Sequence, residues 1–77
     1  KSARLIGFDL KNMTSESDSN CVMSCFREIK CRSLNVRQDA AGMICQLFAK
    51  RRGYVGFQLV QDGRSTYYEK HASSSYP

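Results

Sequence analysis

Four cysteines constrain this chain more than any other feature of its sequence. Cys21, Cys25, Cys31 and Cys45 follow the spacing C-x3-C-x5-C-x13-C in a chain of only 77 residues. A chain this short buries too little apolar surface to be comfortably stable on its core alone. Even numbers of cysteines in such chains usually form disulfides, which persist outside the reducing cytosol. The cysteines therefore predict a small extracellular domain that is held by two disulfides.

The spacing of the cysteines favours one disulfide pairing without excluding the others. Cys21 and Cys25 are i, i+4 and share one face of an expected helix. We favour a short link, Cys25–Cys31, and a long link, Cys21–Cys45. The pairing Cys21–Cys31 with Cys25–Cys45 is an alternative. The pairing Cys21–Cys25 with Cys31–Cys45 is disfavoured, since an i, i+4 helical pair lies near the upper distance limit for a disulfide.

A zinc site built from the same cysteines is a weaker interpretation. Structural zinc sites usually take their ligands in close pairs such as C-x2-C. The spacing C-x3-C-x5-C followed by an isolated cysteine matches that pattern poorly. We therefore expect no metal and no cofactor.

The charge of the chain indicates an anionic partner. The formal net charge is +5 and the sequence pI is about 9.3, which favours sulfated glycans, acidic protein surfaces, anionic lipids or nucleic acid. The extracellular compartment argues against nucleic acid. No apolar run approaches the roughly 18 residues of a membrane-spanning helix, so no transmembrane segment is expected. The alternative is that the positive charge only keeps a small domain soluble.

Hydrophobic periodicity divides the chain into short elements. Residues 4–13 alternate apolar and polar side chains and predict a first strand. Residues 18–29 predict a helix, with Ser17 or Asp18 as its N-cap. The apolar face of that helix comprises Cys21, Val22, Cys25, Phe26 and Ile29. Two hairpins should follow, formed by strands 31–38 and 43–49 across the turn 39–42, and by strands 54–61 and 65–70 across the turn 62–64.

This order of elements predicts the α+β class, with one α-helix packed on an antiparallel β-sheet of about five strands. The domain should span residues 1–71. Residues 72–77 are small and polar, which is typical of a linker or a disordered tail.

A cationic patch is the first candidate ligand-binding site. Clustered Arg and Lys side chains bind sulfates through charge-assisted hydrogen bonds. The patch could combine the basic turn with Arg27, Lys30, Arg64 and nearby arginines. The residues predicted to bind the ligand are Arg32, Arg37, Lys50, Arg51 and Arg52. The alternative is a solvated turn with scattered surface charge. The aromatic residues Tyr54, Phe57, Tyr67 and Tyr68 could stack on sugars, although filling the sheet core is the simpler interpretation.

Two further motifs bear on function. Asn12-Met13-Thr14 is an N-glycosylation sequon, whose alternative interpretation is an unmodified chance match. His71 is the single histidine of the chain, and the chain lacks clustered carboxylates and, if both disulfides form, free thiols. Because general acid–base and nucleophilic catalysis need such groups, we expect a protein that is not an enzyme.

The residues around the cysteines resemble the signature of the PAN/apple domain family. Segment 19–35 carries C-x3-C on a helix, a third cysteine and then Arg32-Ser33-Leu34, and Cys45-Gln46-Leu47 resembles the later cysteine motif. The segments 10–14 and 65–69 look like the ends of invertebrate PAN modules. The resemblance covers about residues 5–70. Leu34 departs from it mildly, since an aromatic residue is common at this position.

The resemblance implies a helix cradled by a curved antiparallel sheet, with the disulfides Cys21–Cys45 and Cys25–Cys31. It also implies the four-cysteine subtype, since the cysteines of a third bridge between the termini are missing. PAN/apple modules mediate protein–protein or protein–carbohydrate contacts in plasma proteases, growth factors, adhesins and matrix proteins. The matched positions are structural, so the resemblance transfers no ligand.

We therefore expect an extracellular binding or adhesion module, secreted or in a matrix or cell-surface protein, for a protein or a possibly sulfated glycan. The alternative is a free-standing secreted effector such as a toxin or inhibitor. A third possibility is a structural spacer without a ligand.

Reduction of the disulfides is predicted to unfold the domain. Loop entropy assigns about 3.5 kcal/mol to the long link and about 2.3 kcal/mol to the short one, which together match the roughly 5 kcal/mol net stability of a small domain. Circular dichroism before and after reduction measures the effect. A cooperative thermal transition that persists when a thiol assay counts all cysteines as free would contradict it.

Overall fold

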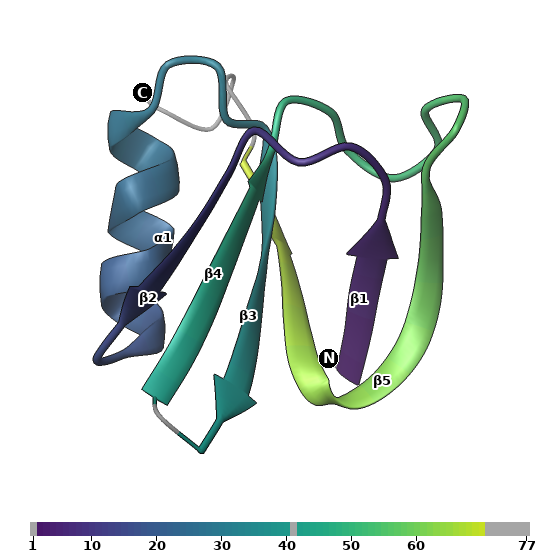
Figure 1. Cartoon of the computed structure of the whole chain (residues 1–77). Coiled ribbons are helices and arrows are strands. Elements are labelled where there is room, and N and C mark those ends of the chain that lie inside the picture. The colour runs from purple at the N-terminus through teal and green to yellow at the C-terminus, as the bar shows by residue number, and fades with distance from the viewer. Residues whose placement is uncertain (1, 41, 71–77) are drawn as a thin grey trace.

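The computed structural model describes residues 2–40 and 42–70. Two strands precede a single stretch of helix, and three strands follow it, as Figure 1 shows. The elements are β1 (Ser2–Ile6), β2 (Lys11–Ser15), α1 (Asp18–Arg27), β3 (Ser33–Asp39), β4 (Gly42–Phe48) and β5 (Gln58–Glu69). His71 and the tail predicted at residues 72–77 lie outside the described residues.

The strands form one antiparallel sheet in the order β1-β5-β3-β4-β2. Helix α1 packs across β2, β4 and β3 on one face. Strand β5 bends so strongly that β1 lies inside the bend (Figure 1). This architecture confirms the predicted α+β class with one helix on a five-stranded antiparallel sheet.

Helix α1 begins and ends through side-chain caps. Ser17 is the N-cap with extended backbone (φ −155°), and its Oγ accepts a hydrogen bond from the N–H of Asn20 at 3.3 Å. At the other end, the Nζ of Lys70 donates to the carbonyl oxygens of Cys25 and Glu28, each at 3.2 Å. The same two carbonyls also accept backbone bonds, from the N–H of Glu28 at 3.2 Å and from the N–H of Cys31 at 3.0 Å, and a cation suits the negative end of the helix dipole. The helix therefore ends at Arg27, two residues before the predicted end.

The disulfides join α1 to the sheet. Cys21 is bonded to Cys45 on β4, and Cys25 is bonded to Cys31 just before β3. This is the favoured pairing, and it is confirmed. The four cysteines are fully buried and form the core between helix and sheet with the β3 and β4 residues Leu34, Val36 and Leu47.

Only part of the predicted helical apolar face is buried. Cys21 and Cys25 have no exposed surface, whereas Phe26 is 58% and Ile29 is 82% exposed. Ile29 lies beyond the end of the helix, and a ten-residue helix with two cysteines bonded into the sheet can turn only one narrow stripe inward. The prediction that Phe26 and Ile29 share the packed face with the cysteines was therefore wrong.

The predicted first strand, residues 4–13, is in fact two strands at opposite edges of the sheet. The chain turns between them at Gly7, which lies against the ring of Phe57. A Cβ at Gly7 would come within 2.2 Å of that ring, so a larger residue does not fit. The alternation of apolar residues does not distinguish one continuous strand from two strands joined by such a turn.

The predicted hairpin of residues 54–61 and 65–70 is also wrong, because its two arms do not pair with each other. They belong to the single bent strand β5, whose first part pairs with β1 and whose last part pairs with β3. Asp62 holds the bend. Its Oδ1 accepts from the N–H of Arg64 at 3.0 Å, its Oδ2 accepts from Ser65 Oγ at 3.1 Å, and Arg4 forms an ion pair with it at 3.4 Å. The Arg64 N–H, more than any other group, lowers the pKa of Asp62.

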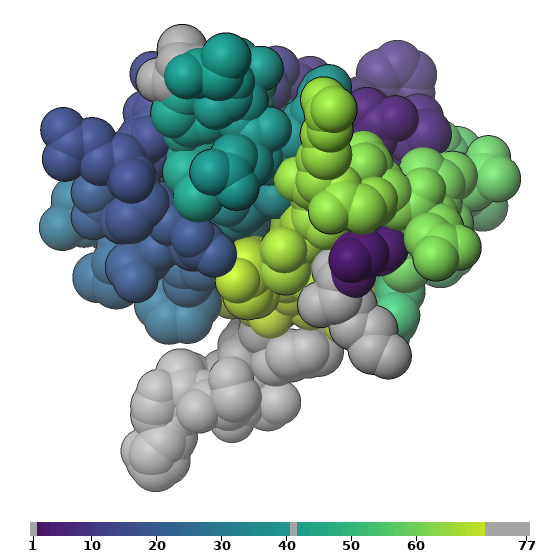
Figure 2. Space-filling model, turned by 90° about the horizontal axis from the view of Figure 1, so that it is seen from below, coloured from purple at the N-terminus to yellow at the C-terminus, as the bar shows by residue number. Residues whose placement is uncertain are grey.

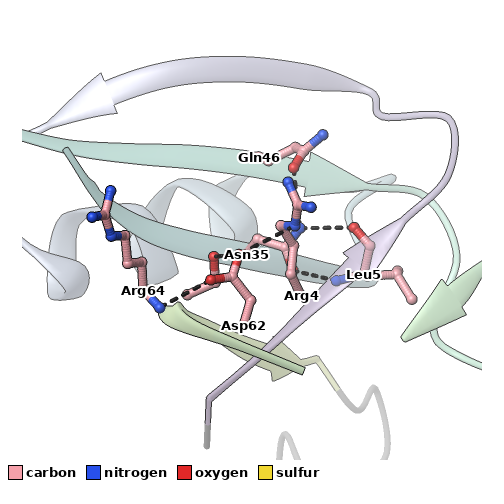
Figure 3. Close-up of polar contacts among 7 residues, drawn as sticks. Arg4, Leu5, Asn35, Gln46, Asp62 and Arg64 are labelled. Carbon is pink, nitrogen blue, oxygen red and sulfur yellow. Dashed lines mark hydrogen bonds and ion pairs between the residues drawn. The ribbon is translucent and has the colours of Figure 1, made fainter. Parts of the chain in front are cut away.

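Asn35 takes the place of a neighbouring strand for β1. Its Oδ1 accepts from the N–H of Leu5, and its Nδ2 donates to the carbonyl oxygen of Leu5, both at 2.9 Å (Figure 3). The same Nδ2 donates to Gln46 Oε1 at 3.0 Å. Asn35 is 1% exposed and lies on the sheet face opposite α1. One buried side chain thus satisfies the N–H and the C=O of Leu5, which no neighbouring strand meets on that side of β1.

Asn35→Ala is predicted to destabilise the domain by about 3 kcal/mol, because it leaves the N–H and C=O of Leu5 without partners. Gln46→Ala is the matched control: it removes one bond to Asn35 and one long, exposed bond to Asp9, leaves both Leu5 groups paired, and should cost about 1 kcal/mol. Urea unfolding measures both free energies, and amide exchange at Leu5 reports on β1. Equal losses in the two variants would contradict the role of Asn35.

Candidate functional site

Three loops meet at the end of the molecule drawn uppermost in Figure 1. They are residues 7–10 between β1 and β2, residues 28–32 between α1 and β3, and residues 49–57 between β4 and β5. We call this end the loop end. It is joined to the scaffold by the hydrogen bond from the N–H of Arg32 to the carbonyl oxygen of Phe48, at 2.7 Å.

A groove of about 360 Å³ lies at the loop end, and we call it the cationic groove. Its lining is formed by Arg32, Ala49, Lys50, Arg51, Arg52, Gly53 and Tyr54. Four of the five predicted ligand-binding cations therefore lie together. Arg37 does not join them. It lies toward the other end of β3, where it pairs with Ser65, and this position is about 17 Å from Arg32 along the chain.

Arg52 is positioned by two residues at the end of β5. Its Nε lies 3.2 Å from a carboxylate oxygen of Glu69, and its N–H donates to the hydroxyl of Tyr67 at 2.9 Å. The Tyr67 hydroxyl donates to the same carboxylate, also at 2.9 Å. Tyr67 and Glu69 thus support the basic loop from below, a role that no local sequence signal indicates.

Burial raises the pKa of the Tyr67 phenol, while the N–H of Arg52 acts in the opposite direction. A raised pKa keeps the hydroxyl protonated at physiological pH. It can therefore accept from Arg52 and donate to Glu69 at the same time.

Lys50 is positioned over an aromatic ring. Its Nζ lies 4.4 Å from the ring centroid of Tyr54, which is a cation–π contact. Its carbonyl oxygen accepts a hydrogen bond from Ser33 Oγ. The side chain of Tyr54 is about half exposed and packs edge-to-face on Phe57, with ring centroids 6.1 Å apart. The groove therefore presents an aromatic face beside its cations.

The other predicted aromatic residues lie away from the groove surface. Phe57 packs between Tyr54 and the buried Phe48. Tyr68 lies on the helix side of the sheet, where its hydroxyl is 3.4 Å from Asp18 and its ring lines a separate hollow with Val22 and Met23. For these residues the packing interpretation holds, whereas Tyr54 remains available at the site.

The opposite end of the molecule, seen in Figure 2, contains a larger hollow of about 620 Å³. It lies between the start of α1, the tip of the β3–β4 hairpin and the bend of β5. Its lining mixes the acids Asp18 and Asp39 with the base Arg64. Two acids against one base leave this hollow only weakly charged, whereas four cations line the cationic groove, which is therefore the stronger candidate for a charged ligand.

Asn12 and Thr14 of the sequon are exposed on the edge strand β2. The side-chain amide of Asn12 donates to the carboxylate of Asp9. Within residues 2–40 and 42–70, no group of three or more histidine, cysteine, aspartate or glutamate residues is arranged to hold a metal ion. No helix in the same residues is long and apolar enough to cross a membrane.

Comparison with known proteins identifies the family. The family model of the PAN domain matches residues 1–72, which is nearly the whole chain, and the chain therefore belongs to the PAN domain family. No curated protein and no solved structure matches this chain. PAN domains are generally protein- or carbohydrate-binding modules of extracellular proteins and typically not enzymes. The family and the two disulfides together indicate an extracellular location.

Tyr67→Phe is predicted to loosen the basic loop, because it removes the acceptor of the Arg52 N–H; the loop should lose about 0.5–1.5 kcal/mol of local stability. Amide exchange at Arg52 measures this change. In the wild type the hydrogen bond from the Tyr67 hydroxyl to Glu69 is present below about pH 10 and is lost as pH rises through the raised pKa of Tyr67, whereas the phenolate still accepts from the Arg52 N–H. The neighbouring Tyr68→Phe is the control, and an unchanged exchange rate in Tyr67→Phe would contradict the assignment.

Proposed function

We propose that this PAN domain is an adhesion module of a secreted, matrix or cell-surface protein, and that its cationic groove binds a sulfated glycan. The observation that carries the proposal is the convergence of Arg32, Lys50, Arg51 and Arg52 around one groove. The module acts by binding and not by catalysis.

The chemistry of the groove suits a sulfated sugar. Guanidinium groups bind sulfate through paired, charge-assisted hydrogen bonds, and an ammonium adds a point charge. The half-exposed ring of Tyr54 offers an apolar face to a sugar ring. Glu69 forms an ion pair with Arg52 and so orients one cation, while the other cations come from two different loops.

We also propose that Asn12 carries an N-linked glycan, since Asn12 and Thr14 are exposed on an edge strand. A glycan there would shield that edge from pairing with other strands. Enzymatic deglycosylation of protein from a secretory eukaryotic host should lower its mass. An unchanged mass would contradict the proposal.

Heparin chromatography tests the groove. Arg32→Gln with Lys50→Gln should elute from a heparin column at clearly lower salt than the wild type, because two of the groove cations are lost. The matched control is Arg37→Gln with Arg64→Gln, which removes the same charge from exposed positions away from the groove.

The comparison separates a specific site from general attraction by net charge. Under the proposal the groove variant shifts strongly and the control shifts little. Equal shifts in both variants would mean that heparin retention depends only on the total charge of the protein. No retention of the wild type would rule out a sulfated ligand. Unfolding in urea confirms that both variants remain folded.

A further inference from the structure

The loop end presents an apolar side chain from each of its three loops. Phe8 is 86% exposed, Ile29 is 82% exposed and Val55 is 92% exposed. Among the described residues, the next most exposed large apolar side chain is Phe26, at 58%. A single exposed apolar side chain is ordinary on a protein surface, but here the three most exposed ones occur on three loops at one end of the fold (Figure 1).

These loops are tied down at their bases. Gly7, beside Phe8, lies against the Phe57 ring, and the N–H of Phe57 donates to the carbonyl oxygen of Tyr54 at 3.0 Å. The loop of Ile29 is closed by the Cys25–Cys31 disulfide. The apolar tips therefore project from supported loops, and docking them requires little further ordering of the chain.

Positive charge is concentrated around the same tips. The three loops carry two carboxylates, Asp9 and Glu28, against five cations: Lys30, Arg32, Lys50, Arg51 and Arg52. Asp9 is engaged by the side chains of Asn12 and Gln46. At the opposite end, the connection between β2 and α1 and the bend of β5 carry Glu16 and Asp62 against Arg64. The charge of the molecule is therefore polarised toward the apolar tips.

We propose that the loop end docks on an anionic lipid bilayer. Phe8, Ile29 and Val55 enter the boundary between headgroups and acyl chains, and the cations of loops 28–32 and 49–57 contact lipid phosphates and carboxylates. Shallow apolar insertion combined with electrostatic attraction is a general mode of binding at a membrane surface.

The form of the surface favours a bilayer over a protein partner. The core of a protein interface is a contiguous and closely packed patch. Here the three most exposed apolar residues come from three separate loops, with cations in the sequence between them. A lipid bilayer is fluid, so separate apolar side chains can insert into it without a partner surface of complementary shape. The inference goes beyond glycan binding, which needs the groove and does not need these three tips.

A single introduced tryptophan reports insertion directly, because the chain contains none. Val55→Trp should show a blue-shifted emission on addition of phosphatidylcholine–phosphatidylserine vesicles and little change with phosphatidylcholine alone. Met23→Trp, at a half-exposed position on α1 away from the loop end, is the control and should not shift. No shift of Val55→Trp with the anionic vesicles would overturn the proposal.

Vesicle sedimentation separates insertion from attraction by charge. The variant with Phe8→Ser, Ile29→Ser and Val55→Ser should bind the anionic vesicles about tenfold more weakly or worse, because three apolar side chains no longer leave water. Met23→Ser should bind like the wild type. Equal binding of the triple variant and the wild type, or absence of wild-type binding, would overturn the proposal, the latter in favour of a protein ligand for the apolar tips.

Heparin retention of the same triple variant distinguishes this proposal from the glycan proposal. Retention equal to that of the wild type, together with lost vesicle binding, supports lipid docking through the tips. If the wild type does not bind heparin but does bind vesicles, the glycan proposal fails and lipid docking stands.

Discussion

The two disulfides between α1 and the sheet are the constraint on which the rest of the structure depends. A helix of ten residues is marginal on its own in water, and Cys21 and Cys25 bond it at two successive turns to β4 and to the entry of β3. The buried sulfur atoms also fill the centre of a core that contains few large apolar residues. Because the covalent links hold the helix in place, much of the remaining apolar surface of α1 stays outside the core.

The other face of the sheet uses a different device. Strand β1 contacts β5 along one side, and on its other side the amide of Asn35 meets both backbone groups of Leu5. Asp62 supports the same arrangement by holding the bend of β5 around β1. A buried polar side chain thus closes the sheet without a further strand, and it is tolerated because its hydrogen bonds are satisfied.

The helix with its disulfides stabilises one face of the sheet, and the contacts of Asn35 and Asp62 stabilise the other. The three loops of the loop end therefore present polar and apolar side chains from a rigid scaffold. Tyr67 and Glu69 position Arg52, and Lys70 covers the end of α1. The cationic groove and the exposed tips therefore share one scaffold while offering two chemistries. The disulfide core fixes this fold, and loops that a rigid scaffold positions are where binding residues commonly lie.

The sequence by itself indicated the disulfide pairing it favoured, an N-cap at Ser17 or Asp18, the hairpin of β3 and β4, and the family. These depend on residues close in the chain or on the chemistry of cysteine. Tertiary structure alone decided that Arg32 joins the basic turn while Arg37 does not, because Arg32 lies just before β3 at the loop end and Arg37 lies toward the far end of that strand. It also decided that residues 4–13 form two strands, that β5 bends around β1, and that Phe26 and Ile29 face outward. Each of these outcomes depends on contacts between residues far apart in the sequence, such as Gly7 with Phe57 and Asn35 with Leu5, and local periodicity carries no information about such contacts.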